Sequence, residues 1–152
     1  MRITGIHHIT MIVASVERSV SFYRDVIGLR IVKQTLNQDD PNARHFYFGD
    51  AEGTPGTVLS VMEYPQMEEG SVGRGSTHHF ALSVDSEDEL EAWREYLGSR
   101  GVACTEVLDR TYFKSVYLRD PDGHIVEIAT RGPGFTVDEP VENLGNRLIT
   151  PR

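Results

Sequence analysis

The sequence predicts an α+β fold built from two tandem βαβββ modules. Three observations support this prediction: an internal repeat, a helix signal after each copy of it, and three short β-type runs after each helix. Residues 7–13, His-His-Ile-Thr-Met-Ile-Val, recur at 78–84 as His-His-Phe-Ala-Leu-Ser-Val. Because such a repeat indicates a repeated structural unit, we expect module 1 at 3–65, module 2 at 76–131 and a C-terminal tail at 132–152, all within one domain covering residues 1–152.

The segment after each His pair is expected to form a helix on the outer face of the sheet. In module 1, Ser15 is a candidate N-cap and Gly28 a candidate stop. Apolar residues recur between them at helical spacing: Val16, Val20, Tyr23 and Ile27. In module 2, Ser86 and Glu89 have the spacing of a capping box, and an apolar row follows: Leu90, Trp93 and Leu97.

Three β-type runs follow each helix. They are 29–35, 45–48 and 57–62 in module 1, and 102–107, 114–118 and 124–129 in module 2. The segments 49–53 and 120–123 occupy corresponding hairpin positions, because Gly and Asp supply the positive φ that tight turns require. The stretch 66–76, rich in Gly and Glu, is the expected linker between the modules.

Composition argues against two classes of partner. The chain has 152 residues, a formal net charge of -8 and a pI of about 5.2. A surface of that sign repels phosphate, so neither nucleic acid nor an anionic membrane is expected as a partner. The single cysteine, Cys104, excludes an internal disulfide, and the sequence shows no signal-peptide core. We therefore expect a cytoplasmic protein.

Strand parity places one histidine of each pair away from the helices. Alternate residues of a strand point to opposite faces, and the more apolar face is expected beneath the helix. Positions 9, 11 and 13 form the apolar row of the first strand, so His8 and Thr10 point to the other face. His79 is likewise opposite the apolar row 80, 82 and 84.

The same parity places Glu127 on the uncovered face of the last strand. A carboxylate in the middle of the run Ile-Val-Glu-Ile-Ala is costly to bury without a partner, so a cation is expected opposite it. Tyr117, on the neighbouring strand, points to the same cavity. The sequence therefore predicts that His8, His79 and Glu127 hold a metal ion.

Two imidazoles and one carboxylate leave coordination positions open for substrate and oxygen. This donor set suits the Fe(II) oxygenases and also accepts Mn, Ni, Co or Zn. An isolated histidine at a strand start is more often bonded only to backbone, but the repetition of the pair favours the metal. His45 and His124 have no counterpart in the other copy and are interpreted as surface or turn residues.

These residues resemble the vicinal oxygen chelate superfamily of glyoxalase I, extradiol dioxygenases, epimerases and thiol transferases. The resemblance covers residues 3–139 and rests on His8, on His79 before Phe-Ala-Leu-Ser-Val, and on Asp-Pro-Asp-Gly at 120–123 followed by Glu127. It implies paired βαβββ modules curled as a mixed sheet around a half-barrel cavity that contains the metal.

Longer stretches resemble one branch, the ring-cleaving dioxygenases that act on hydroquinones. They are residues 5–10 and 109–117, the latter continuing through 127–130 and 133–139. The resemblance implies Fe(II) on the three ligands and a small aromatic diol, catechol or hydroquinone-like, as substrate with O2. It also implies a polar shell, in which Thr10, Tyr117 and Arg110 bind substrate and Tyr117, Arg110, His7 and His78 assist catalysis.

Enzymes of that branch carry four modules, whereas two are present here. A second subunit can replace the missing modules across a two-fold axis. We therefore expect a homodimer with the metal site between module 1 of one chain and module 2 of the other.

Two alternatives remain open. The same metal site suits a glyoxalase-like lyase, isomerase or epimerase, or a thiol transferase. Glyoxalase I proper is disfavoured because the resemblance implies a fourth ligand at position 60, where Ser60 stands, and parity turns Glu63 to the other face. The second alternative is a non-catalytic protein that binds a drug or metabolite in the cavity.

Overall fold

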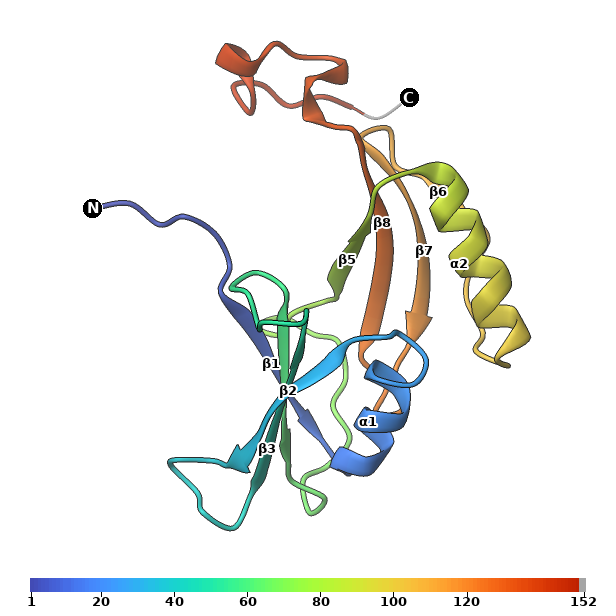
Figure 1. The fold of residues 1–152 in the computed structure, drawn as a ribbon. Helices are drawn as coiled ribbons and strands as arrows, with labels where there is room; N and C mark the ends of the chain where they lie inside the picture. Colours follow the sequence, from blue (N-terminus) through green and yellow to red (C-terminus); the bar gives the residue numbers. More distant parts are fainter. Residues whose placement is uncertain (151–152) are drawn as a thin grey trace. The chain divides into compact units, whose positions relative to one another are not determined.

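The computed structural model describes residues 1–150, which fall into two compact units. One comprises Met1–Ser71 together with Asp120–Gly123, and the other comprises Val72–Arg119 and the chain from His124 onward. Each contains a mixed four-stranded sheet, in the orders β1-β4-β3-β2 and β5-β8-β7-β6 (Figure 1). The structure thus confirms the α+β class and its two βαβββ modules.

Module 1 follows the predicted order of elements. Its bounds are β1 His8–Val13, α1 Val16–Tyr23, β2 Arg30–Leu36, β3 Arg44–Gly49 and β4 Val58–Glu63. β1 pairs in parallel with β4, and the other pairings are antiparallel. Ser15 caps α1 by accepting a hydrogen bond from the Arg18 amide.

Module 2 repeats this order, but its strand β6 has only two residues. Its bounds are β5 Phe80–Val84, α2 Glu87–Ser99, β6 Leu108–Asp109, β7 Phe113–Arg119 and β8 Ile125–Pro133. β5 pairs in parallel with β8. Ser86 caps α2 by accepting a hydrogen bond from the Glu89 amide, as the capping-box spacing predicts.

Three predicted boundaries are wrong. α1 ends at Tyr23 rather than near Gly28, because the amide of Ile27 bonds back to the Phe22 carbonyl in a wider turn. The strand expected at 102–107 is reduced to an isolated bridge at Cys104, and β6 begins only at Leu108. β8 runs four residues beyond its predicted end at 129, to Pro133.

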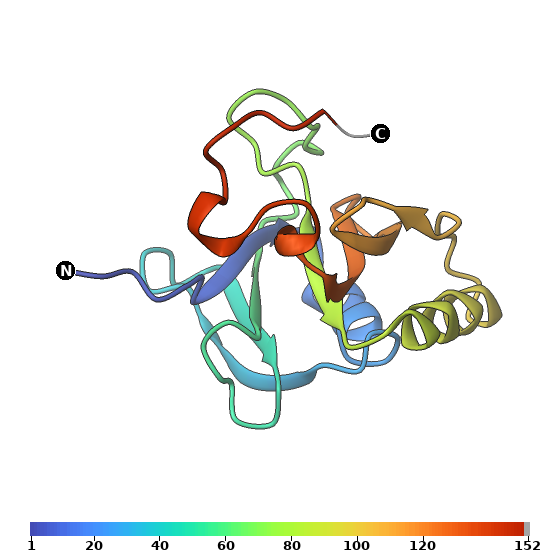
Figure 2. The ribbon, with the colours of Figure 1, turned by 90° about the horizontal axis from the view of Figure 1, so that it is seen from above.

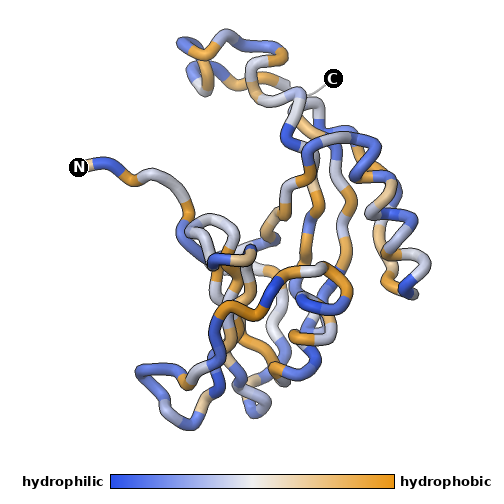
Figure 3. Tube along the Cα trace, viewed as in Figure 1, coloured by the Kyte–Doolittle hydropathy of each residue, from blue (hydrophilic) through white to orange (hydrophobic). Residues whose placement is uncertain are grey.

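The core of each module lies between its helix and one face of its sheet. In module 1 the fully buried side chains include Tyr23 of α1, Phe48 of β3 and Val61 of β4. In module 2 they include Leu97 of α2 and Val126 of β8. Figure 3 shows hydrophobic residues concentrated along the strands and hydrophilic ones in the loops.

The tip of the β7–β8 hairpin belongs to the first unit. The Tyr23 hydroxyl donates to the Asp120 carboxylate at 2.7 Å, and the Ala14 amide donates to the Asp122 carboxylate at 2.9 Å. Arg18 of α1 donates to the Pro121 carbonyl. These bonds fix the Asp-Pro-Asp-Gly turn to module 1 even though its strands belong to module 2.

The tail after β8 contains two short 3-10 turns, Phe135–Val137 and Val141–Asn143, drawn in red in Figures 1 and 2. Within residues 1–150, no helix is long and apolar enough to cross a bilayer.

Candidate metal centre

Module 2 gathers a compact cluster around Glu127. This carboxylate is 2% exposed, in the centre of β8. Its Oε2 lies 2.8 Å from His79 Nε2, and its Oε1 accepts a hydrogen bond of 2.9 Å from the Tyr117 hydroxyl. Tyr117 is directly opposite Glu127 in the β7–β8 register. Both carboxylate oxygens therefore have partners, as a buried charge requires.

The remaining predicted residues of module 2 join this cluster. His78 Nδ1 lies 2.9 Å from His79 Nδ1, with the two rings at 86° to each other. The Arg110 guanidinium carbon lies 5.2 Å from the centre of the Tyr117 ring, in the range of a cation–π contact. All five residues predicted here, His78, His79, Arg110, Tyr117 and Glu127, thus lie together on one unit.

Module 1 repeats the histidine arrangement. His7 Nδ1 lies 3.0 Å from His8 Nδ1, with the rings at 85°. When two neutral imidazoles share one hydrogen at Nδ1, the donor ring keeps a lone pair at Nε2. A donor at His8 Nδ1 leaves His8 Nε2 available as a ligand, whereas His79 Nε2 lies 2.8 Å from Glu127 Oε2 and becomes available when a cation replaces the proton between them.

A chain of uncharged polar groups lies on the His8 face of this sheet. Thr10 Oγ1 is 2.7 Å from Ser60 Oγ, and Ser60 Oγ is 3.1 Å from His45 Nε2. His45 stacks on Tyr47, whose hydroxyl is 3.4 Å from His45 Nδ1. Burial, followed by the nearby His8, lowers the pKa of His45 below its ordinary value.

The interpretation of His45 as a surface or turn residue is therefore wrong. It is partly buried in β3 and bonded to Ser60 of β4. Parity contained the necessary signal, because His45 and Tyr47 alternate with Phe46 and Phe48. The absence of a second copy masked its role, since the corresponding residue of module 2 is not a histidine.

The strand registers define equivalent positions in the two modules. Thr10 pairs with Ser60 across β1 and β4, and Ala81 pairs with Glu127 across β5 and β8. Since His8 and His79 each lie two residues before those partners, Ser60 occupies the place of Glu127. Glu63 faces away from this site: it accepts from the Val16 amide and from Arg44.

The donor set fits a divalent metal. His79 Nε2 and Glu127 Oε2 lie within hydrogen-bonding distance of each other. A bound cation would replace the proton that these two atoms share. Imidazole and carboxylate are the donors that Fe, Mn, Ni, Co and Zn accept. Within residues 1–150, neither unit gathers three His, Cys, Asp or Glu side chains by itself. His8 belongs to the first unit, and His79 with Glu127 to the second.

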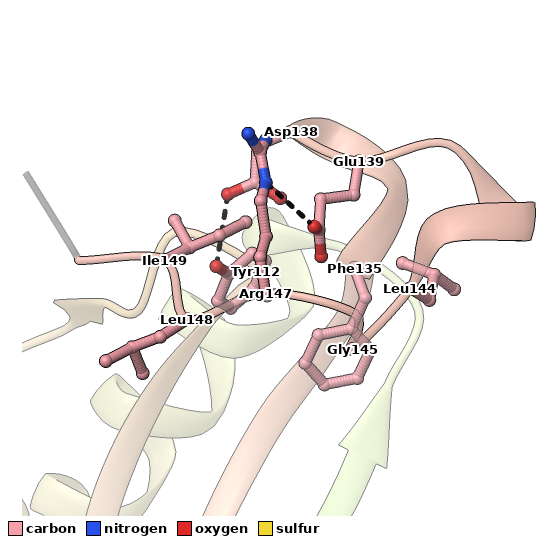
Figure 4. Close-up of a pocket in the computed structure, with 9 residues that line it drawn as sticks. All are labelled: Tyr112, Phe135, Asp138, Glu139, Leu144, Gly145, Arg147, Leu148 and Ile149. Carbon is pink, nitrogen blue, oxygen red and sulfur yellow. Dashed lines mark hydrogen bonds and ion pairs between the residues drawn. The ribbon is translucent and has the colours of Figure 1, made fainter.

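A separate cavity of about 460 Å³ lies beneath the tail (Figure 4). The Tyr112 hydroxyl donates to the Asp138 carboxylate at 3.1 Å, and Arg147 donates to Glu139 at 3.1 Å. Apolar residues complete the wall: Phe135, Leu144, Leu148 and Ile149. None of the predicted site residues lines it.

A family description matches this arrangement of modules. The model of the Glyoxalase/Bleomycin resistance protein/Dioxygenase superfamily matches residues 5–128. The chain belongs to this superfamily. The resemblance inferred from the His pairs, the Asp-Pro-Asp-Gly turn and Glu127 is thereby confirmed.

Curated relatives of this chain carry the names of two classes of enzyme. "Putative ring-cleaving dioxygenase MhqE" of Bacillus subtilis strain 168 is 38% identical over 70% of this chain and 35% of its own. The chlorohydroquinone/hydroquinone 1,2-dioxygenase of Sphingobium indicum is 33% identical over 80% of this chain and 38% of its own length. The metallothiol transferase FosB of Staphylococcus saprophyticus is 31% identical over 84% of this chain and 78% of its own length.

Solved structures of the superfamily agree with the fold. A crystal structure of a "putative dioxygenase" from Bacillus subtilis superposes with a TM-score of 0.78 at 36% identity, covering 86% of this chain and 42% of that one. The present chain spans between 35% and 46% of the length of each of four dioxygenase relatives. The FosB relative is matched over a much larger share of its length.

Proposed function

We propose that this chain is a metal-dependent ring-cleaving dioxygenase that acts on a catechol or hydroquinone-like aromatic diol. The observation that carries the proposal is Glu127, a carboxylate buried at a strand centre and bonded by His79 and Tyr117. Structural ion pairs can account for a buried carboxylate, but the paired histidines of both modules favour a metal. The names of the dioxygenase relatives support ring cleavage as the proposed reaction class.

His8, His79 and Glu127 are the proposed ligands, and Fe(II) is the proposed metal, with Mn, Ni, Co or Zn as substitutes. Two histidines and one carboxylate leave positions open for other molecules. When bound, Fe(II) supplies Lewis acidity toward a diol oxygen and an electron source for O2.

The protein's own groups orient the ligands and the substrate. His7 and His78 hold their neighbours in the tautomer that leaves Nε2 free, through the contacts of 3.0 and 2.9 Å. Tyr117 holds the Glu127 carboxylate in place. Arg110, stacked on Tyr117, supplies a positive charge to a substrate oxygen. Thr10, beside His8 on the same face of β1, supplies a hydroxyl to the same substrate.

The proposal includes a homodimer in the cytoplasm. Its ligands come from module 1 of one chain and module 2 of the other, since each module alone supplies an incomplete set. The dioxygenase relatives, more than twice as long as the stretch they share with this chain, are consistent with modules that must be doubled.

Anaerobic purification with elemental analysis tests the proposal, followed by an oxygen-electrode screen of catechols and hydroquinones. We expect bound iron and substrate-dependent oxygen uptake. Glu127→Gln should lose both, because the amide is a poorer ligand and leaves the site without its only carboxylate. Glu95→Gln, the same change at an exposed position of α2, is the matched control. Full metal occupancy in Glu127→Gln would refute its role as a ligand.

Thiol transfer is the second candidate, favoured by the 78% of the FosB relative that this chain covers. The same ligands would then polarise an oxygen of an electrophile without redox change, as they would in a lyase, isomerase or epimerase. Full activity with Zn or Ni, consumption of a thiol and no oxygen uptake would favour this candidate. A protein that binds a drug or metabolite without chemistry would retain its ligand after Glu127→Gln.

A further inference from the structure

We propose that His45 is the base that receives a proton from the bound diol, through the hydroxyls of Thr10 and Ser60. This inference rests on the proposed function and assigns a task to a residue that the ligand set does not use. The three residues come from three adjacent strands, β1, β4 and β3, and all belong to the first unit.

The contacts form an unbroken hydrogen-bonded chain. Thr10 Oγ1 and Ser60 Oγ are 2.7 Å apart, and Ser60 Oγ and His45 Nε2 are 3.1 Å apart. Both distances lie within hydrogen-bond range. Thr10 is exposed, whereas Ser60 is completely buried. Ser60, in the middle of this hydrogen-bonded relay, is therefore closed to water. Thr10, at its outer end, is open to a substrate next to His8.

The proton balance requires only shifts along these bonds. The diol hydroxyl gives its proton to Thr10 Oγ1, the Thr10 proton passes to Ser60 Oγ, and the Ser60 proton passes to His45 Nε2. One O–H bond of the diol breaks and one N–H bond forms, which leaves a diol anion and an imidazolium. The two hydroxyls finish with the number of protons with which they began.

The surroundings of His45 keep it ready to accept a proton. Burial and the nearby His8 lower its pKa below the ordinary value, so the neutral form prevails near neutral pH. The other titratable groups on this sheet face are His8 of β1, Tyr47 of β3, and Arg30 and Lys33 of β2. β4 contributes only uncharged residues to this face: Val58, Ser60 and Met62.

Module 2 has no equivalent base. Register places Ser115 where module 1 has His45, because Ser115 pairs with Ala129 and His45 pairs with Met62. Glu127 takes the place of Ser60, and its carboxylate is already shared by His79 and Tyr117. The first deprotonation is therefore assigned to module 1.

The test uses the full chain, loaded anaerobically with Fe(II), and 4-nitrocatechol, a diol whose visible absorption changes on ionisation. Wild type should bind the probe as its anion at a pH below the one at which the free probe ionises. His45→Gln and Ser60→Ala should retain iron but require higher pH to ionise the bound probe. Their kcat should fall about 100-fold with little change in KM. Gln34→Ala, on an exposed residue of β2 opposite Phe46, is the control.

Chemical rescue separates a proton acceptor from a packing residue. Imidazole added to His45→Ala should restore anion binding and part of kcat, whereas it should do nothing for Ser60→Ala. If iron-loaded, active wild type and the two relay variants bind the same fraction of anion, the inference is wrong and the proposed function stands. If wild type holds no metal and takes up no oxygen, the proposed function fails and this inference fails with it.

Discussion

The two modules share a topology and a histidine pair but differ in what faces those histidines. In module 2 the facing strand carries Glu127, a charged group held by His79 and Tyr117. In module 1 the same register position carries Ser60, within an uncharged chain that ends at His45. The repeated backbone therefore places side chains at equivalent points, while single residues decide the chemistry of each module.

This difference argues for one complete ligand set from two unlike halves. A second carboxylate at position 60 would give each half the means to hold an ion with its own histidine. Ser60 is a poor ligand for this class of metal, so the proposed ligand set takes only His8 from module 1. Under this proposal, the rest of the module 1 face is available for substrate binding and proton transfer.

The largest expected effect tests whether the halves depend on each other. His8→Ala and Glu127→Gln should each lose metal and activity in pure form, because each removes one of the three proposed ligands. Mixing the two variants after unfolding and refolding should regenerate about one quarter of the wild-type sites, since half of the dimers then contain one intact site. Metal content and oxygen uptake measure the recovery.

Absence of recovery, with dimers demonstrated by analytical ultracentrifugation, would contradict a site shared between subunits. Metal retention by His8→Ala would be more damaging, because module 2 alone would then suffice. Either outcome would contradict the proposed sharing of metal ligands between module 1 of one chain and module 2 of the other.

A second comparison uses the equivalent tyrosines. Tyr117→Phe removes the donor to Glu127 Oε1 and should lower metal affinity or activity about 10- to 100-fold. Tyr47→Phe removes only the long contact of 3.4 Å to His45 and keeps the stacked ring, so its effect should be far smaller. Metal titration against a competing chelator compares the two. Equal effects would mean that Tyr117 acts by packing.

Much of this site follows from periodicity. The His pairs, the parity of β1, β5 and β8, and the position of Ser60 are encoded locally, because a strand alternates its faces whatever it packs against. The β6 boundary was not predictable in this way. The stretch around Cys104 bonds instead through Thr105, whose amide and hydroxyl both pair with the backbone of Tyr117.

Other features depend on contacts between distant segments. No local pattern shows that the tip at 120–123 packs on α1, since Tyr23 and Asp120 are 97 residues apart. His45 was missed for a different reason: a repeat highlights what the modules share, whereas His45 is what distinguishes them. Differences between equivalent positions deserve the same scrutiny as their similarities.

The hairpin tips provide a third comparison, measured as stability. Tyr23→Phe removes a buried hydrogen bond to Asp120 and should cost about 1–3 kcal/mol in the free energy of unfolding. At the corresponding tip of module 1, Asp50 is exposed and bonds only its own turn, so Asp50→Asn should cost less. Denaturant unfolding measures both. A larger loss from Asp50→Asn would reverse the assigned roles of the two tips.

The smallest expected effect concerns acid. Arg44 bonds Glu17 and Glu63, holding the pKa of Glu17 at about 2 and that of Glu63 below its ordinary value. A carboxyl whose pKa is lowered by folding stabilises the native state above its ordinary pKa and loses that contribution as pH falls. The contribution of this network should therefore be complete above pH 4.5, the reference value of both carboxyls, and decline toward pH 2.

Arg44→Met should flatten that part of the profile of Tm against pH, and only modestly, because water screens the exposed pair of Arg44 with Glu17 and only the pair with Glu63 is partly buried. Arg94→Met, which removes the exposed pairs of Arg94 with Glu91 and Glu106 in module 2, is the matched control. Module 1 amides should lose hydrogen-exchange protection first as the pH falls, because Arg44 joins β3 to α1 and β4. If wild type and Arg44→Met gave parallel profiles of Tm against pH, ionisation of Glu17 and Glu63 would add no stability through Arg44. The proposed contribution of this network would then be wrong.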